Sequence, residues 1–216
     1  ATFASAGRAS WPPDSAFSRA RAIRYAKRAC ARSRWAMPSC CSAFRMSSRV
    51  RAPASNDRRL DVGRIADVLA ALEPDIVALQ ELDVGRRRTG HVDQAHEIAR
   101  QLAMSHHFHP ALRVEEERYG DAILTALPER LVKVGPLPGH PRTAALEPRG
   151  ALWIEAMVEG RPVQVINTHL GLVPREQQVQ AAHLAGPEWL GHPDRNGPTI
   201  LLGDFNATTS SLVYRT

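Results

Sequence analysis

The sequence predicts a mixed α/β fold in which helices and strands alternate irregularly around a mixed sheet. Residues 57–216 alternate between short apolar runs, typical of buried strands, and stretches with helical periodicity. Residues 152–158 and 163–168 alternate apolar and polar side chains on either side of Gly160, which predicts an antiparallel hairpin. Because this hairpin lies among alternating strands and helices, we expect a mixed sheet and not a purely parallel one.

The first part of this region predicts a helix, a strand and a second helix. Asp61 can cap a helix that Pro74 ends. Residues 76–79 are predicted to form a short buried strand with Glu81 at its carboxyl end, and residues 93–102 a second amphipathic helix. The apolar positions of the first helix are Val62, Ile65, Ala66, Leu69 and Leu72.

The second part predicts two further strands and one more helix. Residues 122–124 follow a glycine and are apolar, as expected of a strand. Residues 176–184 are predicted to be helical, with Gly186 ending the helix. Residues 199–202 are predicted to form a buried strand that runs directly into Asp204.

Positive charge is confined to the first quarter of the chain. Residues 1–55 hold ten arginines and Lys27 against the single acid Asp14, a net charge of +10. Residues 56–216 hold 17 basic and 21 acidic side chains, a net charge of −4. A nucleic-acid enzyme is expected to be basic on its folded face, so the charge of the second region argues against one.

The first 55 residues are not expected to build a core, since Ala, Ser and Arg account for 34 of them. Three interpretations remain open: a targeting peptide, a disordered basic arm that contacts nucleic acid, or sequence from the wrong frame of a GC-rich gene. We therefore divide the chain into a basic Ala/Ser/Arg-rich segment, residues 1–55, and a folded region, residues 56–216.

Cysteine usage and hydropathy exclude several classes of protein. The three cysteines, Cys30, Cys40 and Cys41, have the spacing of neither a disulfide framework nor a zinc site. No window approaches 18 consecutive apolar residues, so we expect no membrane span. We expect a cytoplasmic monomer, with organelle targeting by residues 1–35 as the alternative location.

Candidate chemical groups follow three of the predicted strands: Glu81, His169 and the pair Asp204 and Asn206. Side chains at the ends of neighbouring strands converge on one rim, where α/β proteins place their sites. A carboxylate there suits Mg²⁺, and the other three can move protons or contact phosphoryl oxygens. Taken singly, each residue also has an ordinary interpretation as a solvated acid, a structural histidine or turn chemistry.

Five blocks of sequence strengthen the functional interpretation when they are considered together. They resemble, in spelling and order, the endonuclease/exonuclease/phosphatase superfamily over residues 56–216, and the segment 88–95 is most similar to its small bacterial metal-dependent hydrolases. The resemblance implies a four-layer α-β-β-α sandwich of two mixed sheets, here incomplete at both ends. The blocks are Leu79-Gln80-Glu81, Tyr119-Gly120-Asp121-Ala122-Ile123-Leu124, Pro148-Arg149-Gly150-Ala151-Leu152, Asn167-Thr168-His169-Leu170-Gly171-Leu172 and Leu202-Gly203-Asp204-Phe205-Asn206.

The resemblance also implies roles for individual residues. Glu81 resembles the family's metal-binding glutamate, for which we expect Mg²⁺, with Mn²⁺ as the alternative. His169 is similar to the strand-end histidine that hydrogen-bonds the scissile phosphate. Asp204 resembles the aspartate that orients or deprotonates the attacking water, or assists the leaving group. Asn206 resembles the accompanying amide that contacts the phosphate.

Two further residues are candidates for binding the substrate phosphate: Asp121, where many relatives have Asn, and Arg149, which precedes the hairpin. The implied activity is divalent-metal-dependent hydrolysis of a phosphoester, more specifically a phosphodiester. The alternative is a non-catalytic protein that binds nucleic acid through its basic N-terminal arm.

Two blocks of the family pattern have no counterpart in this sequence. The Asn-bearing first strand is replaced by Met46-Ser47-Ser48-Arg49-Val50, and no Ser-Asp-His block follows Asn206. We therefore expect weak or absent activity, and exposed apolar faces around Leu152, Ile154, Val163 and Val165. The histidines do not replace the missing block, and we expect them to be surface or loop residues. His106, His107 and His109 are expected on a strand or loop that follows the second helix.

Overall fold

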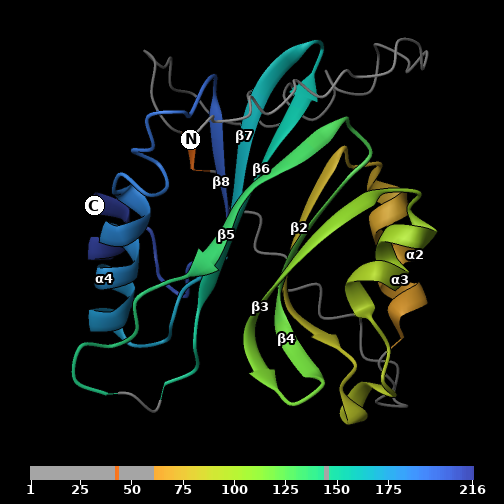
Figure 1. Ribbon diagram of the computed structural model, residues 1–216, viewed down its shortest axis with the longest axis horizontal. Helices are drawn as coiled ribbons and strands as arrows, with labels where there is room; N and C mark the ends of the chain where they lie inside the picture. The colour runs from red at the N-terminus through yellow and green to blue at the C-terminus, as the bar shows by residue number, and fades with distance from the viewer. Residues whose placement is uncertain (1–41, 44–60, 144–145) are drawn as a thin grey trace, which may run out of the picture. The chain divides into compact units, whose positions relative to one another are not determined.

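The computed structural model describes residues 42–43, 61–143 and 146–216, all within the compact unit Arg34–Thr216. Figure 1 shows its two sheets and three α-helices. The helices are α2 (Val62–Leu72), α3 (Gln94–Gln101) and α4 (Pro174–Ala185). The strands are β1 (Ser42–Ala43), β2 (Ile76–Val84), β3 (Ser105–Val114), β4 (Glu117–Thr125), β5 (Glu129–Pro136), β6 (Gly150–Val158), β7 (Arg161–His169) and β8 (Thr199–Asp204).

The larger sheet is mixed, as the sequence predicts. Its strand order is β1-β8-β7-β6-β5. Strand β8 runs parallel to both β1 and β7, whereas β6 is antiparallel to β7 and β5. The hairpin of β6 and β7 is confirmed, with Gly160 in its turn at a φ of 77°.

The smaller sheet, in the order β2-β4-β3, is antiparallel throughout, so the expectation of two mixed sheets is wrong for this one. A turn of two residues joins β3 directly to β4. Such a tight turn can connect only antiparallel strands, because a parallel pair needs a long crossover.

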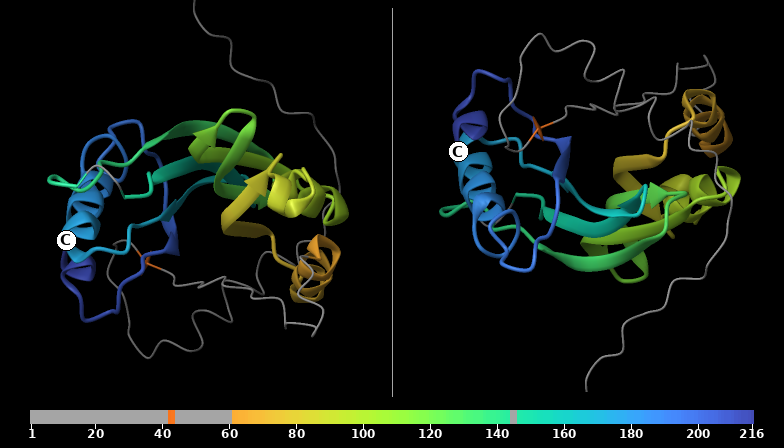
Figure 2. Two further views of the ribbon diagram at one scale, coloured as in Figure 1. Left: turned by 90° about the horizontal axis from the view of Figure 1, so that it is seen from below. Right: turned by 90° about the horizontal axis from the view of Figure 1, so that it is seen from above.

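The four layers of the predicted α-β-β-α sandwich are confirmed. Helices α2 and α3 pack on the outer face of the smaller sheet, where Ala66, Leu69 and Ile98 are buried against it. Helix α4 covers the outer face of the larger sheet through Leu184. Figure 2 shows α4 and α2 on opposite sides of the two sheets.

The inner layer contradicts the expectation of exposed apolar faces. Leu152, Ile154 and Val165 are fully buried with Ile123 of the smaller sheet, and Val163 packs partly buried against them. The two sheets therefore cover each other's apolar faces, which removes this surface from water.

One amide joins the two sheets at the end of this apolar layer. The fully buried Asn167 on β7 donates hydrogen bonds to the carbonyl oxygens of Leu79 (3.0 Å) and Ala122 (2.9 Å). Gln80 donates to the side-chain oxygen of Asn167 at 2.7 Å. Because a buried amide is costly unless it is bonded, these contacts favour one register between β7 and the smaller sheet.

The predicted helices and their caps are largely confirmed. Asp61 accepts a hydrogen bond from the backbone of Arg64, and Asp93 caps α3 in the same way through His96. The apolar face of α2 ends earlier than predicted, because Leu72 in its last turn is 57% exposed. Strand β5 was not predicted. Its apolar residues do not alternate regularly with polar ones, and two of them, Leu131 and Val134, are exposed.

For the histidines after α3, the structure confirms the strand and not the loop, but their side chains are not at the surface as expected. His106, His107 and His109 lie in the strand and are all partly buried. Among the described residues no helix is long and apolar enough to cross a membrane. The predictions for residues 1–55 fall outside the described residues, apart from the two residues of β1.

Candidate active site

The ends of β7 and β8 bring three of the predicted site residues together. His169 and Asp204 are register partners on these parallel strands. The side-chain nitrogen of Asn206 lies 3.0 Å from Nε2 of His169 and donates to the carbonyl of Leu170 at 2.8 Å. The backbone nitrogen of Asn206 donates to Asp204 Oδ1 at 2.9 Å, which closes the turn after β8.

Arg149 reaches the other side of the same imidazole. It precedes β6, is only 7% exposed, and places a guanidinium nitrogen 3.0 Å from Nδ1 of His169. The same nitrogen lies 2.8 Å from a carboxylate oxygen of Glu147. The Nε–H of Arg149 is buried without a hydrogen-bond partner in the part of the chain that the structure describes.

Two donor groups approach the imidazole of His169, one at each ring nitrogen. Arg149 can only donate, and the Asn206 nitrogen also donates, yet a neutral imidazole offers one acceptor nitrogen. The unpartnered Nε–H of Arg149 adds a further donor. The arrangement is therefore complementary to a ligand that brings several acceptor oxygens.

Asp121 on β4 is buried, with 3% exposure, and interacts electrostatically with Arg149. The pKa of Asp121 is raised to about 7, mainly by burial, and the charges of Glu81 and Glu147 contribute to the rise. The positive charge of Arg149 and a hydrogen bond from the backbone of Glu81 act in the opposite direction. Asp121 is thus poised between its carboxylate form and a protonated form that can donate a hydrogen bond.

Glu81 lies in a different local structure from the one predicted. Strand β2 does not end before it but continues to Val84, and the register with β4 shifts between Leu79 and Leu82. Glu81 occupies this bulge with a φ of 62° and is exposed. A bulge re-aims the side chain at its position. The charge of Glu81 acts on Asp121 and Tyr119 of the neighbouring strand β4.

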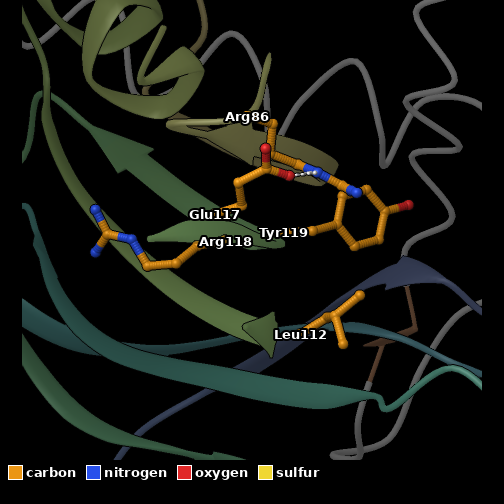
Figure 3. Close-up of a pocket in the computed structure, with 5 residues that line it drawn as sticks. All are labelled: Arg86, Leu112, Glu117, Arg118 and Tyr119. Carbon is orange, nitrogen blue, oxygen red and sulfur yellow. Dashed lines mark hydrogen bonds and ion pairs between the residues drawn. The ribbon is translucent and has the colours of Figure 1, made fainter. Parts of the chain in front are cut away.

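An aromatic ring and two arginines lie together at the start of β4. Tyr119 lies two residues before Asp121, and Figure 3 shows its ring beside Arg86 and near Leu112. The guanidinium carbons of Arg86 and Arg88 lie 5.7 and 5.6 Å from the ring centroid. Burial, followed by the charges of Glu81 and Glu147, raises the pKa of Tyr119, so its hydroxyl stays protonated.

A comparison with protein families identifies the family to which the fold belongs. Residues 45–216 match the model of the Endonuclease/Exonuclease/phosphatase family. The chain belongs to this family. The match covers all five blocks and begins before residue 56, where the resemblance in the sequence starts. No curated protein matches the sequence.

Solved structures of the family share the fold. An endonuclease/exonuclease/phosphatase from Beutenbergia cavernae is 26% identical, with a TM-score of 0.54 over 69% of this chain and 43% of that one. The human Nocturnin catalytic domain with bound sulfate is 22% identical, with a TM-score of 0.53 over 70% of this chain and 58% of that one.

A third structure, the mannosyl-6-phosphatase Bt3783 of Bacteroides thetaiotaomicron, is 18% identical, with a TM-score of 0.56 over 71% of this chain and 59% of that one. The chain thus spans between 43% and 59% of the length of these three structures.

Members of this family generally use a divalent metal, and the residues at the rim are compatible with one. The described residues contain no group of three or more His, Cys, Asp or Glu side chains that could hold a metal ion. Mg²⁺ does not require such a group, because one or two carboxylates with waters and phosphate oxygens suffice. The charges of Glu81 and Glu147 disfavour ionisation of Asp121, and a cation held by Glu81 would offset this repulsion.

The sequence did not reveal two functional candidates on α4. Gln177 and Gln180 are 4% and 0% exposed and hydrogen-bond the backbone beside the site. The available signal was their spacing of three residues, which puts both amides on the buried face that also carries Leu184. Buried amides on the inner face of a helix need partners, which makes such positions worth testing.

Proposed function

We propose that this chain belongs to a divalent-metal-dependent phosphodiester hydrolase. The observation that carries the proposal is that Arg149 and Asn206 both approach His169 with donor groups, while the Nε–H of Arg149 has no partner among the described residues. Phosphate oxygens are acceptors and carry negative charge, so a phosphoester would satisfy these donors. Membership of the family agrees with this chemistry.

Each site residue has a defined part in the proposed reaction. Arg149, His169 and Asn206 donate hydrogen bonds to the equatorial oxygens as negative charge develops on them. Asp204, held by the backbone of Asn206, orients or deprotonates the water whose oxygen attacks phosphorus in line with the leaving alcohol. A divalent cation at Glu81, with Mg²⁺ preferred over Mn²⁺, supplies positive charge to the phosphate.

The substrate is proposed at the level of its chemical class. The net charge of −4 over residues 56–216 does not favour long nucleic acids. Small phosphodiesters, phospholipid head groups and sugar phosphates all present the oxygens that the donor cluster requires. Asp121 assists by keeping Arg149 in place when charged and by donating a hydrogen bond when protonated.

Hydrolysis of bis(4-nitrophenyl) phosphate by the purified chain tests the proposal. We expect slow hydrolysis that requires Mg²⁺ and stops with EDTA, and Glu81→Gln should lower kcat/KM by about 100-fold. Glu159→Gln is the matched control, because Glu159 is also exposed with a positive φ of 50° but lies in the hairpin turn. A rate that is independent of metal, or is unchanged in Glu81→Gln, would contradict the proposal.

The alternative function remains the binding of nucleic acid by the basic arm. The net charge of +10 in residues 1–55 favours it, because clustered Arg and Lys side chains neutralise phosphates. In that case the folded region would act as a scaffold, and Glu81→Gln would leave the affinity of the protein for nucleic acid unchanged.

A further inference from the structure

Two buried glutamines of α4 make hydrogen bonds to loops that are far apart in the sequence. The side-chain nitrogen of Gln177 donates to the carbonyl of Gly171 and to the carbonyl of Asn206, both at 2.9 Å. One amide thereby joins the loop that follows β7 to the loop that follows β8. Asn206 is the residue whose side chain contacts His169, so Gln177 holds its backbone from behind the site.

Gln180, one turn further along α4, extends the same network. Its side-chain oxygen accepts from the backbone nitrogen of Gly171 at 2.8 Å, and its nitrogen donates to the carbonyl of Pro138 at 3.2 Å. The neighbouring Leu137 donates its backbone N–H to the carbonyl of Arg149 at 2.8 Å. Gln180 is thus connected through two residues to the backbone of Arg149.

Gly171, at the centre of this network, is closely packed. A Cβ atom at Gly171 would lie 1.9 Å from a carboxylate oxygen of Glu176, which is itself buried at the start of α4. The glycine allows the loop to approach the helix closely enough for both glutamines to bond it. Three side chains of α4, those of Glu176, Gln177 and Gln180, therefore contact the loop that follows directly on His169.

Apolar side chains would fill these two positions on α4 at lower cost if packing were their only role. A buried amide loses its water partners, and its hydrogen bonds within the protein return only part of that free energy. What the amides add is direction, because each bond fixes a backbone group at one distance and angle.

We propose that Gln177 and Gln180 are positioning residues that set the spacing of Arg149, His169 and Asn206 around the phosphate. The proposal rests on the proposed hydrolytic function and adds the device that aligns its groups. Neither glutamine contacts the substrate; both act on the backbone next to residues that do. Of the two glutamines, Gln177 has the larger effect on this spacing, because it donates a hydrogen bond to the carbonyl of Asn206 and Gln180 does not.

The test compares two adjacent glutamines of the same helix in the full chain. Gln177→Leu removes both donors, whereas Gln178→Leu is the matched control, because Gln178 is half-buried and outside this network of bonds. We expect kcat to fall by about 10- to 100-fold in Gln177→Leu with KM changed little, and both constants to stay at wild-type values in Gln178→Leu. Equal effects in the two variants would overturn the proposal.

A third variant separates alignment from loss of stability. Gln177→Glu places a carboxylate against the two carbonyl oxygens, and this side chain can donate a hydrogen bond only when it is protonated. We expect its activity relative to wild type at the same pH to recover as the pH is lowered, with no such recovery for Gln178→Glu. An activity ratio that is independent of pH would contradict the role of Gln177 as a donor.

A readout without substrate distinguishes failure of this proposal from failure of the proposed function. The NMR signals of the His169 ring and of the Asn206 side-chain amide should move in Gln177→Leu and stay in place in Gln178→Leu. Movement of these signals in a protein whose wild type hydrolyses no phosphoester would refute the hydrolytic function and support the positioning role. Unmoved signals would refute the positioning role, whatever the activity.

Discussion

His109 lies where the two sheets meet, close to the site but outside it. It is the register partner of Asp121 on the neighbouring strand, and its ring packs on the backbone of Gly150. A Cβ atom at Gly150 would lie 2.5 Å from this ring, so only glycine leaves room for it. Burial lowers the pKa of His109 below its ordinary value of 6.5.

We predict that His109 makes the fold sensitive to acid. Because its pKa is lower in the folded than in the unfolded chain, the stability it contributes is present above about pH 6.5 and is lost as the pH falls through the folded-state pKa. The free energy of unfolding by urea should therefore fall less between pH 7 and pH 5 in His109→Gln than in wild type. The exposed His91→Gln serves as control, and the same slope for both variants would rule out His109 as the source.

The site residues differ in how well their positions could be predicted from the sequence. His169, Asp204 and Asn206 were predicted to converge because they follow apolar runs, and β7 and β8 are indeed adjacent and parallel. The position of Glu81 was less predictable, since the bulge that re-aims it depends on pairing with β4. Neither a bulge nor its partner strand leaves a periodic signal in one sequence.

At the scale of elements, the contact between β7 and β8 determines the geometry of the site. Gly203 lies opposite Thr168 in this parallel pair, with a φ of 147°. A Cβ atom there would lie 1.9 Å from the carbonyl oxygen of Thr168. The strand that delivers Asp204 therefore needs glycine at the position before it, both for its φ and for the close approach.

We predict that Gly203→Ala destabilises the protein by about 3 kcal/mol, because it combines backbone strain with overpacking at a strand pair. The measurement compares the thermal unfolding of Gly203→Ala with that of Gly139→Ala. Gly139 is the matched control, since a Cβ atom there would meet nothing within 4 Å. Similar melting temperatures for the two variants would show that β8 can shift away from β7 at little cost.

Elements also differ in how well the sequence predicts them. Helices α2, α3 and α4 were predicted because their caps, breakers and apolar spacing are local features. Strand β5 was missed because it is an edge strand of the larger sheet with exposed Leu131 and Val134. An edge strand buries little of either face, so its residues need not alternate.

At the scale of the whole molecule, charge is divided between two regions of the chain. The segment 1–55 carries a net charge of +10, and residues 56–216 carry −4. All the described site residues belong to the second region. Binding of polyanions and phosphoester hydrolysis should therefore be separable by deletion.

We predict that deletion of residues 1–41 leaves hydrolysis of a small phosphodiester unchanged within about twofold, because β1 and the whole site are retained. The deletion removes eight basic residues and one acid, so any binding of single-stranded DNA should weaken and lose most of its dependence on salt concentration. Salt titrations of both proteins measure this change. Retention of the full salt slope after deletion would place the binding surface on the folded region.

The sequence by itself determined the family, the helices, the central hairpin and the residue types at the rim, because each depends on local spacing and on motifs a few residues long. The tertiary structure alone decided the bulge at Glu81, the two donors that approach His169, and the hydrogen bonds of the two amides of α4. The contacts that join Arg149 to His169, Gln177 to Asn206 and Asn206 to His169 connect residues 20, 29 and 37 positions apart, and burial determines which polar groups must be paired. Local sequence patterns carry no information about such pairing.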